Sequence, residues 1–210
     1  MFLCSVSVSA QADGLNANLL FPNFEKGVAI LKDGSNLNGL FNYSTIIEKV
    51  VFLDEDSSIS TFIDPSIVGA VFIDTRVFEN TSKNIFYERI QVGDDFYYIE
   101  WKAKWISIGK KGAKGQRSQS YGITSYQVAE SGTLNSPRFT VDNGMEAILE
   151  PSFYLKIDNN FRKFNSVASL AKLVRGNKEE IECFAKTEQI NFKKPDDVNR
   201  LMQFVSSKYM

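Results

Sequence analysis

The 210-residue sequence contains no histidine. Histidine is the usual near-neutral proton shuttle and the commonest transition-metal ligand in proteins. Its absence excludes the Ser-His-Asp and Cys-His nucleophile systems. Carboxylates, lysines, tyrosines and hydroxyls remain for chemistry, and they form no motif that we can name. The sequence therefore predicts no catalytic residue, no metal ligand and no cofactor.

Cysteine, net charge and long apolar runs are scarce as well. The cysteines are Cys4 and Cys183, and Cys183 lies in a helical stretch with no basic neighbour. We therefore expect a small core residue at 183 rather than a reactive thiol. The formal charge of −1 argues against a protein that works mainly by binding nucleic acid. No later segment approaches the roughly 18 apolar residues of a membrane span, so no transmembrane helix is expected.

Residues 1–12, MFLCSVSVSAQA, resemble the end of a secretory signal peptide. The run is apolar or small, and residues 8–10 form a small-residue cleavage box. No charged n-region precedes it, and Leu3 disfavours a lipid anchor at Cys4. The alternation in residues 5–8 also fits a first β-strand. We favour the signal-peptide remnant, which implies a periplasmic or secreted protein.

Residues 13–165 are predicted to form a β-rich domain. The chain is rich in aromatic residues, with 17 Phe, 8 Tyr and 2 Trp, which favours strands and a substantial core. Turn signals such as Asp33-Gly34 and Asp64-Pro65 separate short apolar segments. The strands are expected at 27–32, 37–43, 49–53, 59–63, 68–78, 84–92, 96–108, 126–129, 138–141, 153–157 and 161–164.

The apolar period changes from strand to helix after residue 165, so residues 166–210 are predicted to form a three-helix element docked on the sheet. Gly176 is expected to end the first helix, Asn177 with Glu180 to begin the second as in a capping box, and Asp196 to cap the third. The fold class is therefore α+β, with an antiparallel sandwich or partly open barrel before the helices. The predicted core includes Ile30, Phe52, Ile73, Phe86, Ile99, Trp101, Leu170, Phe184, Leu201 and Val205.

Several segments share a pattern with one group of proteins. Residues 24–34 read FEKGVAILKDG, an aromatic strand ending in Lys precedes the loop GKKGA at 109–113, and residues 169–184 read SLAKLVRGNKEEIECF. In these features the chain resembles a group of exported proteins that is common in Bacteroidota and has no assigned activity. The resemblance spans most of the chain. It implies an envelope or secreted address and carries over no functional residue.

The segment from 95 to 121 holds the candidate ligand-binding residues. A strand places Tyr97, Ile99, Trp101, Ala103 and Trp105 on one face. Tyr97, Trp101 and Trp105 have the large rings that stack on sugars or planar ligands, although burial in a sheet core is the usual fate of such a stripe. The cations Lys110, Lys111, Lys114 and Arg117 follow in a glycine-containing loop, which is either solvated or in contact with an anionic polymer.

Acidic residues cluster at 54–56, 94–95 and 196–197, where turns and a helix start account for them. A glycosidase instead needs two carboxyl groups about 5–9.5 Å apart across a cleft. Asn42 and Asn80 match the glycosylation sequon, which matters only in a eukaryotic secretory route. The leading hypothesis is an exported, non-enzymatic binding or structural protein of the bacterial envelope, whose partner is an envelope protein or anionic polymer. The alternative is a carboxylate-based hydrolase acting on an envelope or dietary glycan.

Overall fold

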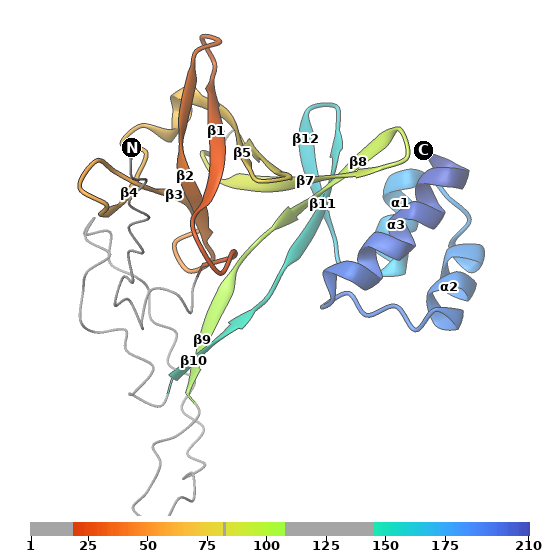
Figure 1. The fold of residues 1–210 in the computed structure, drawn as a ribbon. Helices are drawn as coiled ribbons and strands as arrows, with labels where there is room; N and C mark the ends of the chain where they lie inside the picture. Colours follow the sequence, from red (N-terminus) through yellow and green to blue (C-terminus); the bar gives the residue numbers. More distant parts are fainter. Residues whose placement is uncertain (1–18, 82, 108–144) are drawn as a thin grey trace, which may run out of the picture.

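The computed structural model describes residues 19–81, 83–107 and 145–210, and it has an α+β fold. A ten-stranded antiparallel sheet is accompanied by a two-stranded ribbon and followed by three C-terminal helices (Figure 1). The predicted fold class is confirmed, and the sheet is not closed into a barrel. The leader at 1–12 and the strands expected at 126–129 and 138–141 lie outside the described residues.

The ten-stranded sheet has the order β12-β11-β8-β7-β6-β5-β1-β2-β3-β4, and β9 pairs with β10 in the ribbon. The strands are β1 Glu25–Leu31, β2 Asn36–Ser44, β3 Lys49–Leu53, β4 Ile59–Thr61, β5 Val68–Ile73, β6 Arg76–Asn80, β7 Phe86–Val92, β8 Asp95–Glu100, β9 Ala103–Ser107, β10 Met145–Leu149, β11 Ser152–Ile157 and β12 Asn160–Phe164. The helices are α1 Val167–Val174, α2 Lys178–Thr187 and α3 Pro195–Tyr209, with a short 3₁₀ helix η2 at Pro65–Ile67.

The single strand predicted at 68–78 is wrong, because β5 and β6 form a hairpin there. Asp74 takes the left-handed backbone conformation, with φ 51°, and begins a tight turn. Asp tolerates this conformation better than most residues, so the turn needs no glycine. The hairpin pairs Ile73 with Arg76 and so brings Arg76 to the face of Val71 and Ile73, whereas one continuous strand would have put it on the opposite face.

The core lies partly within the sheet, where Phe62 meets Phe41 and Phe86, and partly between the sheet and the helices. One hydrophobic cluster joins Tyr43 and Phe78 of the sheet with Leu170 and Leu201 of the helices. Of the predicted core residues, Ile73, Phe86, Ile99, Trp101, Leu170, Leu201 and Val205 are buried, and Phe52 and Phe184 are partly buried against the cluster. Ile30 is only half-buried, because its neighbour Ala29 takes the inward position on β1.

The cap predicted for α2 is present, whereas the cap predicted for α3 is wrong. The Asn177 side chain accepts hydrogen bonds from the backbone of Glu179 and Glu180, as expected for the start of α2. The Glu180 carboxylate does not complete a capping box, because it binds Lys208 and Tyr209 instead. Asp196 does not cap α3, because Pro195 already occupies the first helical position and the cap residue is Lys194. Cys183 is exposed, so its expected core position is also wrong: the core face of α2 is formed by Ile181, Phe184 and Ala185.

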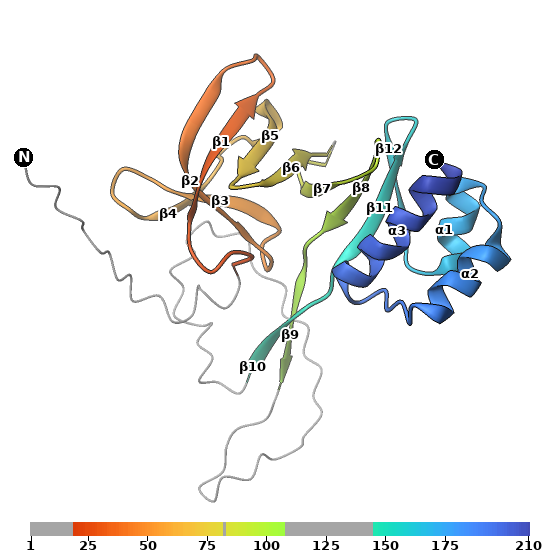
Figure 2. The same cartoon turned by 45° about the vertical axis from the view of Figure 1, so that its right-hand side comes forward.

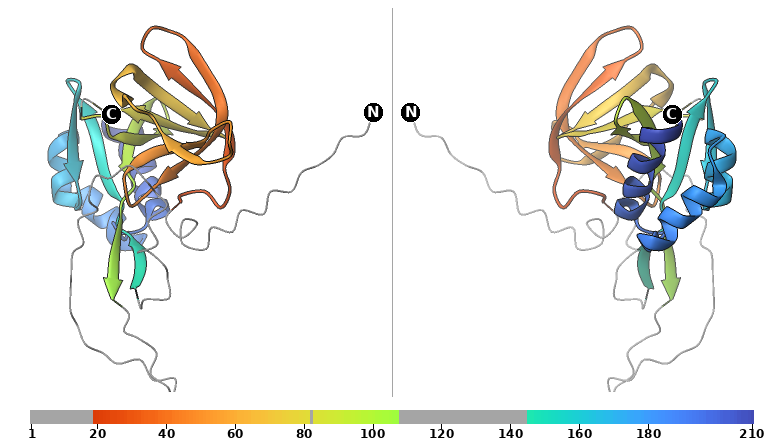
Figure 3. Two further views of the ribbon diagram at one scale, coloured as in Figure 1. Left: turned by 90° about the vertical axis from the view of Figure 1, so that its left-hand side faces the viewer. Right: turned by 90° about the vertical axis from the view of Figure 1, so that its right-hand side faces the viewer.

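The three helices gather on one side of the sheet, away from the β1–β4 end (Figures 1 and 3). α1 contacts β12, and α3 contacts β7. The β9–β10 ribbon continues the β8 and β11 strands and extends away from both the helices and the N-terminal strands (Figure 2). A backbone hydrogen bond of 2.8 Å from Ala103 to Thr45 ties the start of this ribbon to the end of β2.

Replacing Leu201 by Ala tests the shared core. Leu201 is fully buried in α3, so Leu201→Ala should lower the free energy of unfolding by about 2–5 kcal/mol through lost burial and a cavity. Leu37 on β2 is 48% exposed, and Leu37→Ala should change stability by about 0.5 kcal/mol or less. Urea denaturation measures both values. Equal effects of the two substitutions would contradict the placement of α3 in the core.

Candidate functional site

A cleft opens where β8 and β11 stop pairing. The two strands are paired from Glu100↔Ser152 to Tyr98↔Tyr154, and their shared register ends there. β8 nevertheless continues beside β7 to its turn, and β11 continues beside β12 to its turn. The two hairpins therefore diverge (Figure 1), and a cavity of about 610 Å³ lies between them and the helices. This volume is within the range of ligand-binding clefts.

Backbone groups of both strands point into this cleft. The turns Gly93-Asp94 and Asp158-Asn159 each have two residues, so Val92–Asp95 and Ile157–Asn160 are the closing hydrogen-bonded pairs. Hydrogen-bonded and non-bonded pairs alternate along an antiparallel ladder. The N–H and C=O groups of Phe96 and Lys156 therefore point away from their own hairpins and towards each other across the cleft.

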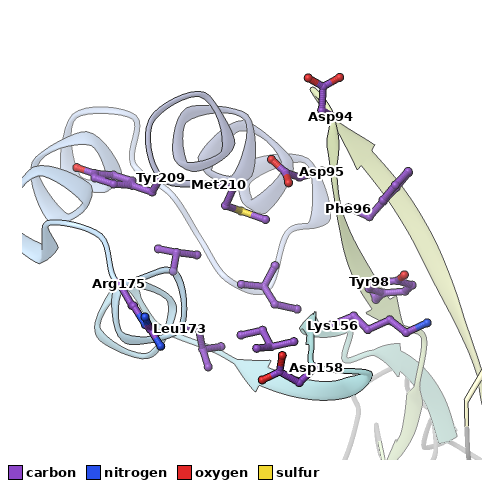
Figure 4. A pocket seen from close by; sticks show the side chains of 13 residues that line it. Asp94, Asp95, Phe96, Tyr98, Lys156, Asp158, Leu173, Arg175, Tyr209 and Met210 are labelled. Atoms are coloured by element: carbon purple, nitrogen blue, oxygen red, sulfur yellow. The ribbon is translucent and has the colours of Figure 1, made fainter.

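The cleft has an apolar floor and an exposed aromatic wall (Figure 4). Leu155 and Ile157 of β11 and Leu173 and Val174 of α1 line it, together with Tyr209 and Met210 at the end of α3. The Phe96 side chain on β8 is 38% exposed. The cleft thus combines apolar side chains with strand edges that are open to hydrogen bonding.

Charged groups stand on both rims. Asp94 and Asp95 lie on one side of the cavity and Asp158 lies on the other (Figure 4). The Lys156 ammonium is bound by Glu79 and lies 6.0 Å from the Tyr98 ring centroid. Arg175 is exposed and has no ion-pair partner within the part of the chain that the structure describes. The C-terminal ends of α1 and α3 add negative partial charge, so the field in the cleft favours cations.

Ser206 of α3 fixes the position of the β7–β8 hairpin. Its hydroxyl oxygen lies 2.9 Å from the carbonyl oxygen of Val92 and 2.9 Å from a carboxylate oxygen of Asp95. The turn can approach the helix this closely because residue 93 is glycine: a Cβ there would lie 3.2 Å from the Ser206 hydroxyl oxygen. Gly93 also has a positive φ of 60°, which glycine adopts without strain.

A cluster of aromatic rings beside a buried carboxylate covers the outer face of the sheet. Tyr87 stacks on Tyr154 with ring centroids 4.7 Å apart, and Phe161 packs edge-on against Tyr87 and Tyr98. Beside these rings the buried Glu100 carboxylate accepts a 2.6 Å hydrogen bond from the Tyr154 hydroxyl and forms an ion pair with Lys102. Burial and the nearby Glu79 carboxylate raise the pKa of Tyr98 to about 12. Burial likewise raises the pKa of Tyr154.

The inner face holds a buried ion pair. Arg76 binds both carboxylate oxygens of Glu88, each at 2.5 Å, and the Trp101 indole donates to the same carboxylate at 2.6 Å. The Arg76 guanidinium also lies 4.7 Å from the Phe21 ring centroid. Glu88 thus receives three donors and is a structural group.

The structure places Tyr97 and Trp101 in the core, where the Tyr97 hydroxyl donates to Asn199 at 3.3 Å. These two rings therefore form part of the sheet core. Trp105 lies on β9, but its side chain is outside the described residues, as are Lys110, Lys111, Lys114 and Arg117.

The two sequon asparagines are structural in this fold. Asn42 is fully buried, and its amide nitrogen donates to the carbonyl oxygens of Phe21 and Asn23. The Asn80 amide nitrogen donates to the carbonyl oxygens of Pro65 and Val68. In both residues the nitrogen that a glycan would modify is already committed to the fold.

Comparisons with known proteins found no matching family model, no matching curated protein and no matching solved structure. Within residues 19–81, 83–107 and 145–210, no group of three or more metal-binding side chains could hold a metal ion. None of the described helices has the length and apolar character needed to cross a membrane. The cleft between β8 and β11 is the candidate site on its own geometry.

Removing Arg76 tests the buried ion pair. Arg76→Ala leaves the buried Glu88 carboxylate without its cation and should cost about 3–5 kcal/mol of unfolding free energy. The control is Arg200→Ala, since the Arg200–Glu188 pair is exposed and should contribute about 0–1 kcal/mol. Chemical denaturation at neutral pH compares them, and similar losses would show that the Glu88 pair is not a buried one.

The raised pKa of Tyr98 predicts a loss of stability at alkaline pH. Because folding raises this pKa from 10.0 to about 12, the neutral phenol's contribution is complete below pH 10 and is lost as pH rises through 12. The unfolding free energy of the wild type should therefore fall across this interval. The unfolding free energy of Tyr98→Phe should fall less steeply with pH, and the remaining slope should come from the other tyrosines. Identical slopes of unfolding free energy against pH in the wild type and Tyr98→Phe would contradict the raised pKa of Tyr98.

Proposed function

We propose that this chain is an exported, non-enzymatic binding protein of the bacterial cell envelope, and that the cleft between β8 and β11 is its binding site. The observation that carries the proposal is the end of β8–β11 pairing at Tyr98↔Tyr154, which leaves a cavity of about 610 Å³ with apolar, charged and backbone groups on its walls. The leader-like residues 1–12 and the family resemblance support the export part of the proposal.

The environment of the buried carboxylates supports binding rather than catalysis. A general acid needs a free proton position in a cleft. Glu88 accepts hydrogen bonds from Arg76 and Trp101, and Glu100 accepts from Tyr154 and Lys102. Both carboxylates therefore have structural partners. The cleft itself offers apolar contact area, and burying such area contributes roughly 25 cal/mol per Å² to binding.

Glycan hydrolysis is the second candidate, and one observation favours it. Asp95 and Asp158 lie on opposite rims of the cleft (Figure 4), and acid-base hydrolysis of a glycoside requires two carboxyl groups about 5–9.5 Å apart across a cleft. Asp95 is already engaged by Ser206. A binding protein and a hydrolase differ in one measurable respect, namely the release of new reducing ends from the glycan.

A cleft-filling substitution tests the proposed function. Immobilised wild-type protein should retain a component of the host envelope fraction, and Leu173→Arg should lose it, because a long charged side chain then occupies the cleft floor. Leu37→Arg, at an exposed position on β2, is the matched control and should retain the component. Melting temperatures near that of the wild type would show that both variants are folded.

The same retained material separates the two candidate functions. We expect it to be released unaltered from the wild-type protein, without new reducing ends. New reducing ends that disappear in Asp158→Asn would establish the hydrolase instead. Equal retention by wild type and Leu173→Arg would overturn the cleft as the binding site.

A further inference from the structure

We infer that the ligand of the cleft is an extended polypeptide segment with basic side chains, which enters as an additional β-strand between β8 and β11. This inference rests on the proposed function and names the class of ligand. It follows from the backbone geometry of the cleft, the two kinds of surface beside it and its charge.

The backbone geometry of the cleft favours a polypeptide as its ligand. Phe96 and Lys156 each direct an N–H and a C=O into the cleft, from strands whose other edges are already paired with β7 and β12. A β-strand carries the same donors and acceptors on both of its edges, so it can bond to either wall. Since β8 and β11 are antiparallel, the added strand runs antiparallel to one of them and parallel to the other.

The two surfaces beside the cleft favour a ligand strand in which apolar and polar residues alternate. Side chains of an added strand point alternately to the outer face and to the helices. On the helix side they meet Leu173, Ile157 and Tyr209, which suit apolar residues. On the outer side they lie beside Phe96 and solvent. The preferred segment therefore alternates apolar and polar residues.

The negative charge on the rims of the cleft favours basic side chains at the polar positions of the added strand. Asp94, Asp95 and Asp158 line the cleft, whereas the charge of Lys156 is already neutralised by Glu79. Among the described residues that line the cleft, Arg175 is the remaining cation beside these carboxylates and the C-terminal ends of two helices. A basic strand is electrostatically complementary to this site, and its affinity should fall as salt rises.

A synthetic strand tests the inference directly. The probe is an acetylated and amidated Lys-Val-Lys-Val-Lys peptide, compared with its fully N-methylated form and with a Glu-for-Lys form. The unmodified peptide should bind, and each of the other two should bind at least about tenfold more weakly, because they lose main-chain donors or the attraction to the carboxylates. Calorimetric titration gives the three affinities. Equal binding of the methylated peptide would overturn strand addition.

Two variants locate the peptide in the cleft. Phe96→Pro removes the N–H that points into the cleft and spares the β7–β8 ladder, so peptide affinity should fall about tenfold while the protein stays folded. Asp94→Asn with Asp158→Asn should weaken binding and flatten its salt dependence. The matched control is Asp74→Asn, which sits in another hairpin turn with a similar φ, 51° against 49° for Asp158. Unchanged affinity in both cleft variants would place the peptide elsewhere and overturn the inference.

The result also separates this inference from the proposed function. If the lysine peptide does not bind while envelope material is still lost from Leu173→Arg, the ligand class is wrong and the binding cleft stands. If neither the peptide nor the envelope material depends on the cleft, both proposals fail.

Discussion

The hydrogen bonding of Ser206 to the β7–β8 turn is the constraint on which the cleft depends. It fixes the tip of one hairpin to α3, while β12 of the other hairpin leads through Ser166 directly into α1. The link from β12 to α1 leaves the base of its hairpin, where Phe164 pairs with Phe153, so the turn that is held directly to a helix is the β7–β8 turn. β8 and β11 pair near that base and separate towards the two turns. Gly93 belongs to the same constraint, because a Cβ at this position would lie 3.2 Å from the Ser206 hydroxyl oxygen and the φ of 60° would strain another residue.

Two buried glutamates show how the sheet accommodates buried charge. Glu88 and Glu100 lie on neighbouring strands and face opposite sides of the sheet, since adjacent register positions pair Glu88 with Ile99. Each has a cation and aromatic hydrogen-bond donors: Arg76 and Trp101 serve Glu88, while Lys102 and Tyr154 serve Glu100. A buried charge with a full set of donors is specific to one arrangement of its partners. These networks therefore fix the register of the central strands beside the cleft.

The sequence predicted local structure well where one residue type has one dominant conformation. The Asp33-Gly34 turn, the Asn177 cap and the burial of Ile99 and Trp101 on one face follow from such preferences. The hairpin turn at Asp74 was missed because an apolar pattern continues through it, and Asp196 was misplaced as a cap because Pro195 had already begun α3. The cleft was not predictable. Asp94 and Asp158 were recognised only as turn residues, because their proximity depends on the pairing of β8 with β11, strands far apart in the sequence.

The open ends of β8 and β11 have an energetic consequence that bears on their use. Extending the ladder to Phe96 and Lys156 would add backbone hydrogen bonds, each with a net contribution of about 0.5–1.5 kcal/mol. The fold forgoes them, and the Ser206 hydroxyl of α3 contacts the β7–β8 turn beyond the point where the pairing ends. In the free protein these backbone groups can be satisfied by water, because the cleft is open on its outer face, as the exposure of Phe96 shows. A strand-like ligand replaces that water and forms the backbone hydrogen bonds that Phe96 and Lys156 do not form with each other. The free energy of these hydrogen bonds then contributes to binding.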